Sequence, residues 1–106
     1  MDAKVETILA ELRLRLKEIY GDRLMRLVLY GSQARGDAED GSDIDVLVVL
    51  AGPINHWEEI QRTSEIRIAL LDKYEMLVSC VYVSDDRYAQ EKSPLLINVR
   101  REGLSL

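Results

Sequence analysis

The sequence has few of the features that mark secreted, membrane or nucleic-acid-binding proteins. Its one cysteine, Cys80, excludes an internal disulfide and a cysteine-rich metal site. No apolar run approaches the ~20 residues of a membrane span, and the first residues lead into a charged amphipathic pattern without a signal-peptide core. The basic residues are scattered in a chain of net charge −5, which argues against direct binding to nucleic acid. We therefore expect a soluble, cytoplasmic protein.

The length and composition fit one compact domain over residues 1–106. Hydrophobic residues make up 47% of the chain and charged residues 31%, without a low-complexity tract, as in ordinary globular proteins. A chain of this length buries roughly two thirds of the surface that its unfolded form exposes. The core is therefore modest, and we expect neither a linker nor an internal repeat.

The spacing of apolar residues predicts the element order α-β-β-α-β-α. The predicted helices cover residues 3–20, 57 to about 73 and 94–102, and the predicted strands cover residues 24–30, 43–50 and 76–83. In the second helix, we expect one face to contain Trp57, Ile60, Ser64, Ile68 and Leu71. The fold class that follows is α/β (α+β), with a small mixed sheet of three to four strands flanked by helices.

Two carboxylates stand where the second predicted strand begins. Residues i and i+2 of a strand point to the same face, so Asp43 and Asp45 project side by side. Each carboxylate resists ionisation near the other unless a cation or strong donors neutralise them. Mg²⁺ characteristically takes one or two carboxylates together with substrate phosphates and waters. The pair thus predicts a metal site, although an exposed strand edge or a capping network is the commoner role of such a pair.

A second element of the same loop is suited to binding phosphate. Gly31 ends the first predicted strand and Ser32 opens a short helical turn, which presents backbone N–H groups and a hydroxyl to an anion. Alone, a Gly-Ser pair after a strand is usually only a turn. Together with Asp43 and Asp45, it indicates a site that holds a triphosphate between donors and a metal ion. The chemistry implied is metal-assisted phosphoryl-group transfer.

This pattern resembles the DNA polymerase beta-like nucleotidyltransferase superfamily, and most closely its minimal members, the Mnt proteins encoded beside HEPN-domain partners. The shared residues are Gly-Ser, ten residues, then Asp-X-Asp, with Gly-Ser-X-Ala-Arg-Gly inside, and the resemblance covers nearly the whole chain. It implies that Gly31 and Ser32 contact the triphosphate of ATP and that Asp43 and Asp45 are catalytic and ligate Mg²⁺. Arg35 is either a phosphate contact or part of a structural salt bridge.

The sequence departs from the superfamily pattern at a third carboxylate. Members usually supply this acid from the strand after the second helix, where it helps to deprotonate the attacking hydroxyl, but the best alignment places Ser79 there. Glu75 has the same strand parity but lies about 13 Å away at ~3.3 Å per residue. Two carboxylates suffice for one Mg²⁺ with a nucleotide. Activation of the nucleophile is the step that this substitution affects.

The resemblance implies a Mg²⁺-dependent transfer of AMP from ATP to a hydroxyl, a tyrosine of a cognate HEPN toxin, which makes the chain an antitoxin. One alternative is a weak or inactive module that neutralises its HEPN partner by binding. A weaker alternative is a small-molecule nucleotidyltransferase, whose relatives usually carry an extra helical domain. The apolar residues of the last dozen positions suit a partner contact, and a homo-oligomer stays open.

Two further residues invite a catalytic interpretation. His56 stands at the start of the second predicted helix, where a surface histidine is the ordinary case. Cys80 lies in the middle of a strand, where a small buried apolar residue is expected in place of a nucleophile. We therefore assign neither residue to the site.

Overall fold

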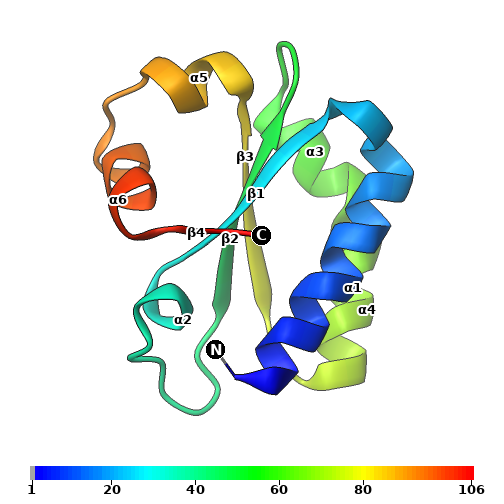
Figure 1. Cartoon of the computed structure of the whole chain (residues 1–106). Coiled ribbons are helices and arrows are strands. Elements are labelled where there is room, and N and C mark those ends of the chain that lie inside the picture. Colours follow the sequence, from blue (N-terminus) through cyan, green and yellow to red (C-terminus); the bar gives the residue numbers. More distant parts are fainter. Residues whose placement is uncertain (1) are drawn as a thin grey trace.

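The computed structural model describes residues 2–106, so Met1 lies outside the described part of the chain. It contains a four-stranded mixed sheet between two layers of helices (Figure 1). The strands are β1 (Leu24–Tyr30), β2 (Ile44–Leu50), β3 (Val78–Ser84) and β4 (Leu104–Ser105). The helices are α1 (Ala3–Tyr20), α2 (Ser32–Arg35), α3 (His56–Arg62), α4 (Ser64–Tyr74), α5 (Asp85–Gln90) and α6 (Pro94–Glu102), with a 3-10 turn at Gly21–Arg23. The predicted fold class is confirmed.

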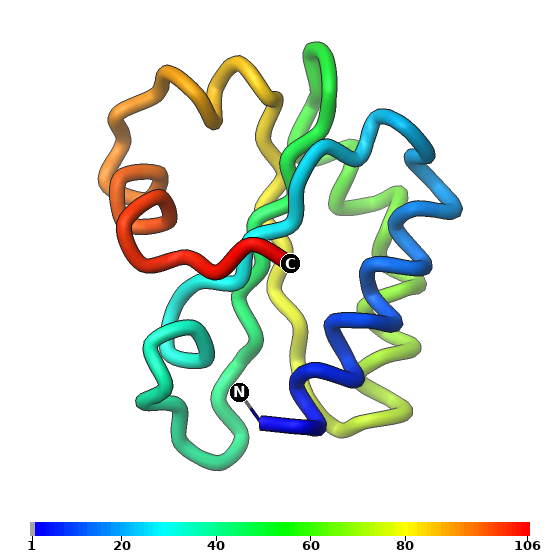
Figure 2. Tube along the Cα trace, in the orientation of Figure 1, coloured from blue at the N-terminus to red at the C-terminus, as the bar shows by residue number. Residues whose placement is uncertain are grey.

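The strand order β3-β2-β1-β4 brings three chain segments to one end of the sheet. Strand β1 pairs antiparallel with β2, which places Tyr30 opposite Asp45. Strand β2 pairs parallel with β3, which places Asp45 opposite Ser79. The end of β1 and the beginnings of β2 and β3 therefore meet, at the lower end of the trace in Figure 2.

The sheet is buried on both faces, which explains the continuous apolar runs of its central strands. Alternate residues of β2 point to opposite sides: Val46 and Val48 enter the larger core with α1 and α4, whereas Leu47 and Val49 enter a smaller core with α6. Figure 1 shows α1, α3 and α4 on one side of the sheet and α2, α5 and α6 on the other. Asp45 and Ser79 belong to the face of the smaller core.

Helix α1 forms as the sequence predicts. Asp2 caps it by accepting hydrogen bonds from the N–H groups of Lys4 and Val5 at 2.7 and 3.2 Å. Its buried apolar residues are Val5, Ile8, Leu9, Leu12 and Leu16, whereas Ile19 is 41% exposed and Tyr20 is buried in its place. None of the helices within residues 2–106 is long and apolar enough to cross a membrane.

The prediction of one continuous helix over residues 57–73 is wrong, since the segment forms two helices, α3 and α4, that are separated at Thr63. The Thr63 hydroxyl turns inward, donating to the Glu59 carbonyl at 2.8 Å and bonding the hydroxyl of Tyr82. The predicted face is also wrong, because Trp57 and Ile68 are each 65% exposed. The break shifts the helical phase, so the buried positions are Glu59, Thr63, Ile66 and Leu70.

Two elements are absent from the prediction, α5 and β4. Helix α5 is polar and short, and it begins where the Ser84 side chain accepts from the Arg87 N–H at 3.2 Å. Strand β4 is two residues long and pairs with Val28 and Leu29 of β1. Both elements are too short to show a periodic hydrophobic pattern in the sequence. The predicted end of α6 at Gly103 is confirmed, while β3 begins two residues later than expected.

Candidate functional site

The turn after β1 is shaped by the conformation of Gly31. Its φ of 74° and ψ of −157° lie in a region that is essentially restricted to glycine. A Cβ at this position would lie 2.5 Å from Oδ2 of Asp45, so the backbone passes directly against that carboxylate. The Gly31 carbonyl accepts from the N–H groups of Ala34 and Arg35 at 3.1 Å. The predicted helical turn is therefore present as α2, which Ser32 opens.

The carboxylate pair lies beside this turn. Asp45 is the second residue of β2 and is partly buried, whereas Asp43 precedes the strand and is exposed. Burial raises the pKa of Asp45, and the charge of Asp43 raises it further, while Arg35 acts in the opposite direction. Burial and the nearby Asp45 also raise the pKa of Tyr30. A cation bound by the pair would offset this unfavourable concentration of negative charge.

The carboxylates of Asp43 and Asp45 fit one hard divalent cation, whose coordination shell a phosphate and waters would complete. Within residues 2–106, no group of three His, Cys, Asp or Glu side chains is arranged to hold a metal ion. Asp43 and Asp45 therefore do not form a closed metal site with a third protein ligand of these types. This open arrangement suits Mg²⁺, which commonly keeps waters and substrate phosphates in its coordination shell.

Ser79 occupies the position next to Asp45 on the neighbouring strand. The two are partners in the parallel register of β2 and β3, so their side chains project from the same face of the sheet. A hydroxyl thus stands where the superfamily pattern would place a third acid. Glu75 does not lie on the strand: it caps the end of α4 with a φ of 57°, outside β3.

Arg35 forms ion pairs with two carboxylates, Asp37 and Glu102, each at 3.2 Å. The second pair joins α2 to the end of α6. These contacts correspond to the salt-bridge interpretation of Arg35. Its side chain is 45% exposed, and its positive charge still acts on Asp45.

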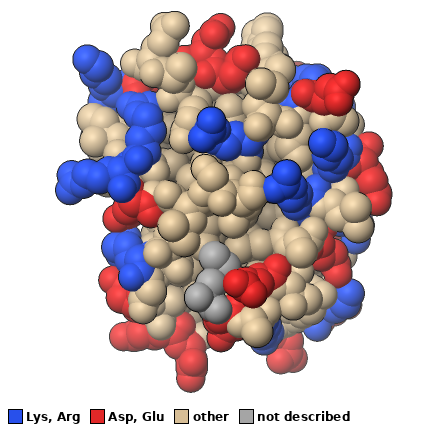
Figure 3. Space-filling view, in the orientation of Figure 1, with Lys and Arg blue, Asp and Glu red and all other residues tan. Residues whose placement is uncertain are grey.

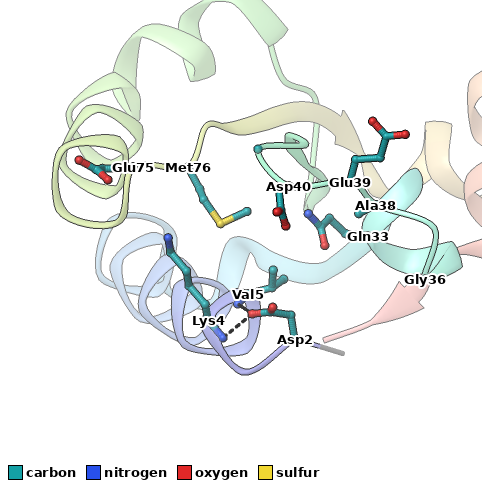
Figure 4. Close-up of a pocket in the computed structure, with 11 residues that line it drawn as sticks. Asp2, Lys4, Val5, Gln33, Gly36, Ala38, Glu39, Asp40, Glu75 and Met76 are labelled. Carbon is teal, nitrogen blue, oxygen red and sulfur yellow. Dashed lines mark hydrogen bonds between the residues drawn. The ribbon is translucent and has the colours of Figure 1, made fainter.

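A cavity of about 540 Å³ lies beside the site, between the loop after α2, the beginning of α1 and the α4–β3 connection (Figure 4). Its lining includes the acids Asp2, Glu39, Asp40 and Glu75, with Lys4 as the one basic residue. Asp43 and Asp45 do not contribute to it. Acidic side chains also gather at the lower end of the molecule in Figure 3. This negative charge disfavours a triphosphate in the cavity itself. The sequence pattern does not predict the cavity, because its lining comes from separate segments of the chain.

Cys80 and His56, which the sequence analysis leaves outside the site, lie in different environments. Cys80 is buried as expected, and burial raises the pKa of its thiol to about 11, which keeps it inert. His56 starts α3 and is half-buried, and its Nε2 atom is buried without a hydrogen-bond partner in the described chain. Its ring meets that of Tyr82 edge-on, with centroids 5.9 Å apart.

The chain is similar in sequence to known proteins. Two come from Methanocaldococcus jannaschii. The first, named "Putative protein adenylyltransferase MJ0141", is 36% identical over 68% of this chain and 72% of its own length. The second, named "Putative protein adenylyltransferase MJ1305", is 31% identical over 94% of this chain. This chain spans 60% of the length of the second relative.

Solved structures share the fold at lower identity. A chain of a toxin–antitoxin structure with AMP-PNP matches 88% of this chain, with a TM-score of 0.59 and 21% identity over 68% of its own length. A chain from a structure of the tri-AMPylated Shewanella oneidensis HEPN toxin in complex with MNT antitoxin matches 92% of this chain, with a TM-score of 0.52 and 20% identity over 68% of its own length.

A family model decides the assignment. The model described as the nucleotidyltransferase domain matches residues 9–93, which include β1, β2, β3 and all five predicted site residues. The matched segment thus contains the Gly31 turn, the carboxylate pair and the Ser79 position. The chain belongs to the nucleotidyltransferase domain family.

Proposed function

We propose that this chain transfers AMP from ATP to a hydroxyl of a partner protein, a tyrosine of a HEPN toxin, and so acts as an antitoxin. The observation that carries the proposal is the contact of the Gly31 backbone with Asp45, because it joins the phosphate-binding turn to the carboxylate pair. The names of the relatives and the toxin–antitoxin structures with this fold support the acceptor class.

In the proposed reaction, the acceptor oxygen bonds to the α-phosphorus of ATP while the bond to the β-phosphate bridging oxygen breaks, and pyrophosphate leaves. Asp43 and Asp45 would hold Mg²⁺, which supplies positive charge for the phosphate oxygens when bound. Ser32 and the backbone at the start of α2 would orient the triphosphate. The acceptor proton must pass to solvent or another base, because the Ser79 hydroxyl is not a base at neutral pH. Slow turnover is the expected result.

A second candidate is neutralisation of the partner by binding alone. The observation that favours it is Ser79 opposite Asp45, at the position of the acid that would take the proton. The two candidates differ in whether the partner becomes covalently labelled. They also differ in their dependence on the carboxylate pair, which binding alone does not require.

The test incubates this chain with Mg²⁺, α-labelled ATP and a HEPN-domain protein as the proposed partner. We expect label on the partner, and none with the double variant Asp43→Asn, Asp45→Asn. The matched control is Asp72→Asn, which removes an exposed carboxylate from α4 on the opposite side of the sheet. Unlabelled partner in a stable, non-toxic complex would reject transfer and favour the binding module. Labelling by the double variant would reject the roles of the two carboxylates.

A further inference from the structure

A groove lies along the outer edge of β3, the strand that carries Ser79. Within residues 2–106, β3 pairs with β2 on one side, and its seven residues include no charged side chain. The groove has a volume of about 270 Å³ and lies between the strand and the α3 and α4 helices. We call it the β3 groove; its lining residues are Ile60, Arg67, Leu77, Val78, Ser79 and Cys80.

Arg67 provides the charge of the β3 groove. Its guanidinium donates to the Thr63 hydroxyl at 2.7 Å and to the Ile60 carbonyl at 2.9 Å, both of which are neutral oxygens. None of the ion pairs within the described chain involves Arg67. The side chain is partly buried and held in place, so a carboxylate arriving in the groove would find a cation already oriented.

The position of the groove connects it to the carboxylate pair. Cys80 points into the larger core on the side of α4 and Arg67, whereas Ser79 projects on the side of Asp45. An extended segment that adds to the edge of β3 would also direct successive side chains to these two sides. One residue would therefore face Arg67, while its immediate neighbour would lie beside Ser79 on the face of the sheet that carries Asp45.

We infer that the β3 groove docks an extended acceptor segment in which an acidic residue stands next to the residue bearing the acceptor hydroxyl. The carboxylate binds Arg67, main-chain hydrogen bonds form along β3, and the adjacent hydroxyl enters the Asp45 side. The apolar side chains of Ile60 and Leu77 flank the segment, and Leu77 is 47% exposed. The inference rests on the proposed function, and it names the class of protein segment that the site accepts.

The test compares two fluorescent eight-residue peptides of alternating valine and threonine with a central acid–tyrosine pair. One carries aspartate before the tyrosine and the other carries asparagine. Binding to the whole chain is measured by anisotropy without ATP, so that the result does not depend on transfer. We expect the aspartate peptide to bind at least about tenfold more tightly, as a hydrogen-bonded charge pair in a partly buried site provides.

Two variants and a control assign the difference to the groove. Arg67→Gln should remove the preference for aspartate, whereas Arg13→Gln, an exposed arginine on α1, should keep it. If Arg67→Gln does not fold, Leu77→Asp places a negative charge in the groove from an exposed position and should weaken binding of the aspartate peptide at least about tenfold.

Equal affinities of the two peptides for the unaltered chain would overturn the inference. Self-association of the chain that Leu77→Asp abolishes, without peptide binding, would instead assign the groove to a second copy. A preference for aspartate that Arg67→Gln removes, with no labelling of either peptide by ATP, would retain the docking site and count against transfer. The two proposals therefore fail separately.

Discussion

The Gly31 turn permits a quantitative test, because a second glycine provides the control. Gly31→Ala forces a side chain into a glycine-only conformation, which costs about 1–3 kcal/mol, and places Cβ 2.5 Å from Oδ2 of Asp45. Gly36→Ala imposes a left-handed conformation at φ 82°, ψ 12°, but nothing lies within 4 Å of its Cβ. The second variant should lose about 1–2 kcal/mol, and the first should lose at least about 1 kcal/mol more.

Thermal unfolding followed by circular dichroism measures the difference. A gap of about 1 kcal/mol corresponds to roughly 4–8 °C in Tm for a domain near this size. Asp45→Ala in the Gly31→Ala background should recover part of the loss, because it removes the atom that Cβ meets. The same replacement in the Gly36→Ala background should give no recovery beyond its effect on the unaltered chain. Equal losses for both glycine variants, or no coupling between positions 31 and 45, would refute the proposed contact.

Three further perturbations follow from the site and the core. Ser79→Asp should speed labelling of the partner by at least about tenfold by supplying a proton acceptor opposite Asp45, and an unchanged rate would show that proton removal does not limit transfer. Because the folded-state pKa of Asp45 is raised, folding favours its protonated form, and stability falls as pH rises through that pKa. Asp45→Asn should therefore raise Tm at pH 7 in metal-free buffer but have a smaller effect near pH 3, and a gain that is the same at both pH values would contradict the shift. Thr63→Val should lower the free energy of unfolding by about 1–3 kcal/mol by removing a hydroxyl partner of Arg67 and Tyr82, whereas a loss below about 0.5 kcal/mol in urea unfolding would count against that network.

The sequence predicts the placement of the candidate site residues more completely than it predicts the outer parts of the fold. Residue type alone is informative at three positions of the site. Few residues other than glycine adopt the backbone conformation of Gly31, and few side chains other than carboxylates supply the negative charge of Asp43 and Asp45. The burial of both sheet faces is also readable from the continuous runs in β1 and β2. The register that pairs Asp45 with Ser79 is a tertiary property, but the family pattern placed Ser79 at the third-acid position from sequence.

The errors arise from contacts between segments that are distant in the sequence. Thr63 divides the second predicted helix by turning its hydroxyl toward Tyr82, a partner 19 residues away that no helical periodicity reports. Strand β4 is too short for a period of two and exists through its pairing with β1. The sequence gives no indication that the Arg67 guanidinium donates only to neutral hydroxyl and carbonyl oxygens. Its proposed role in the β3 groove depends on where the fold places the edge of β3.

The carboxylate pair combines one fixed and one adjustable side chain. Asp45 belongs to β2, which is hydrogen-bonded to neighbours on both sides, whereas Asp43 precedes the strand and is exposed. Closing the pair around a cation would then order Asp43 and the adjoining loop while leaving β2 as it is. In hydrogen–deuterium exchange, ligand binding would slow the amides of residues 37–43 and leave those of β2 at their already slow rate. The strand boundary between the two aspartates thus separates a permanent half of the site from a half that the ligand itself organises.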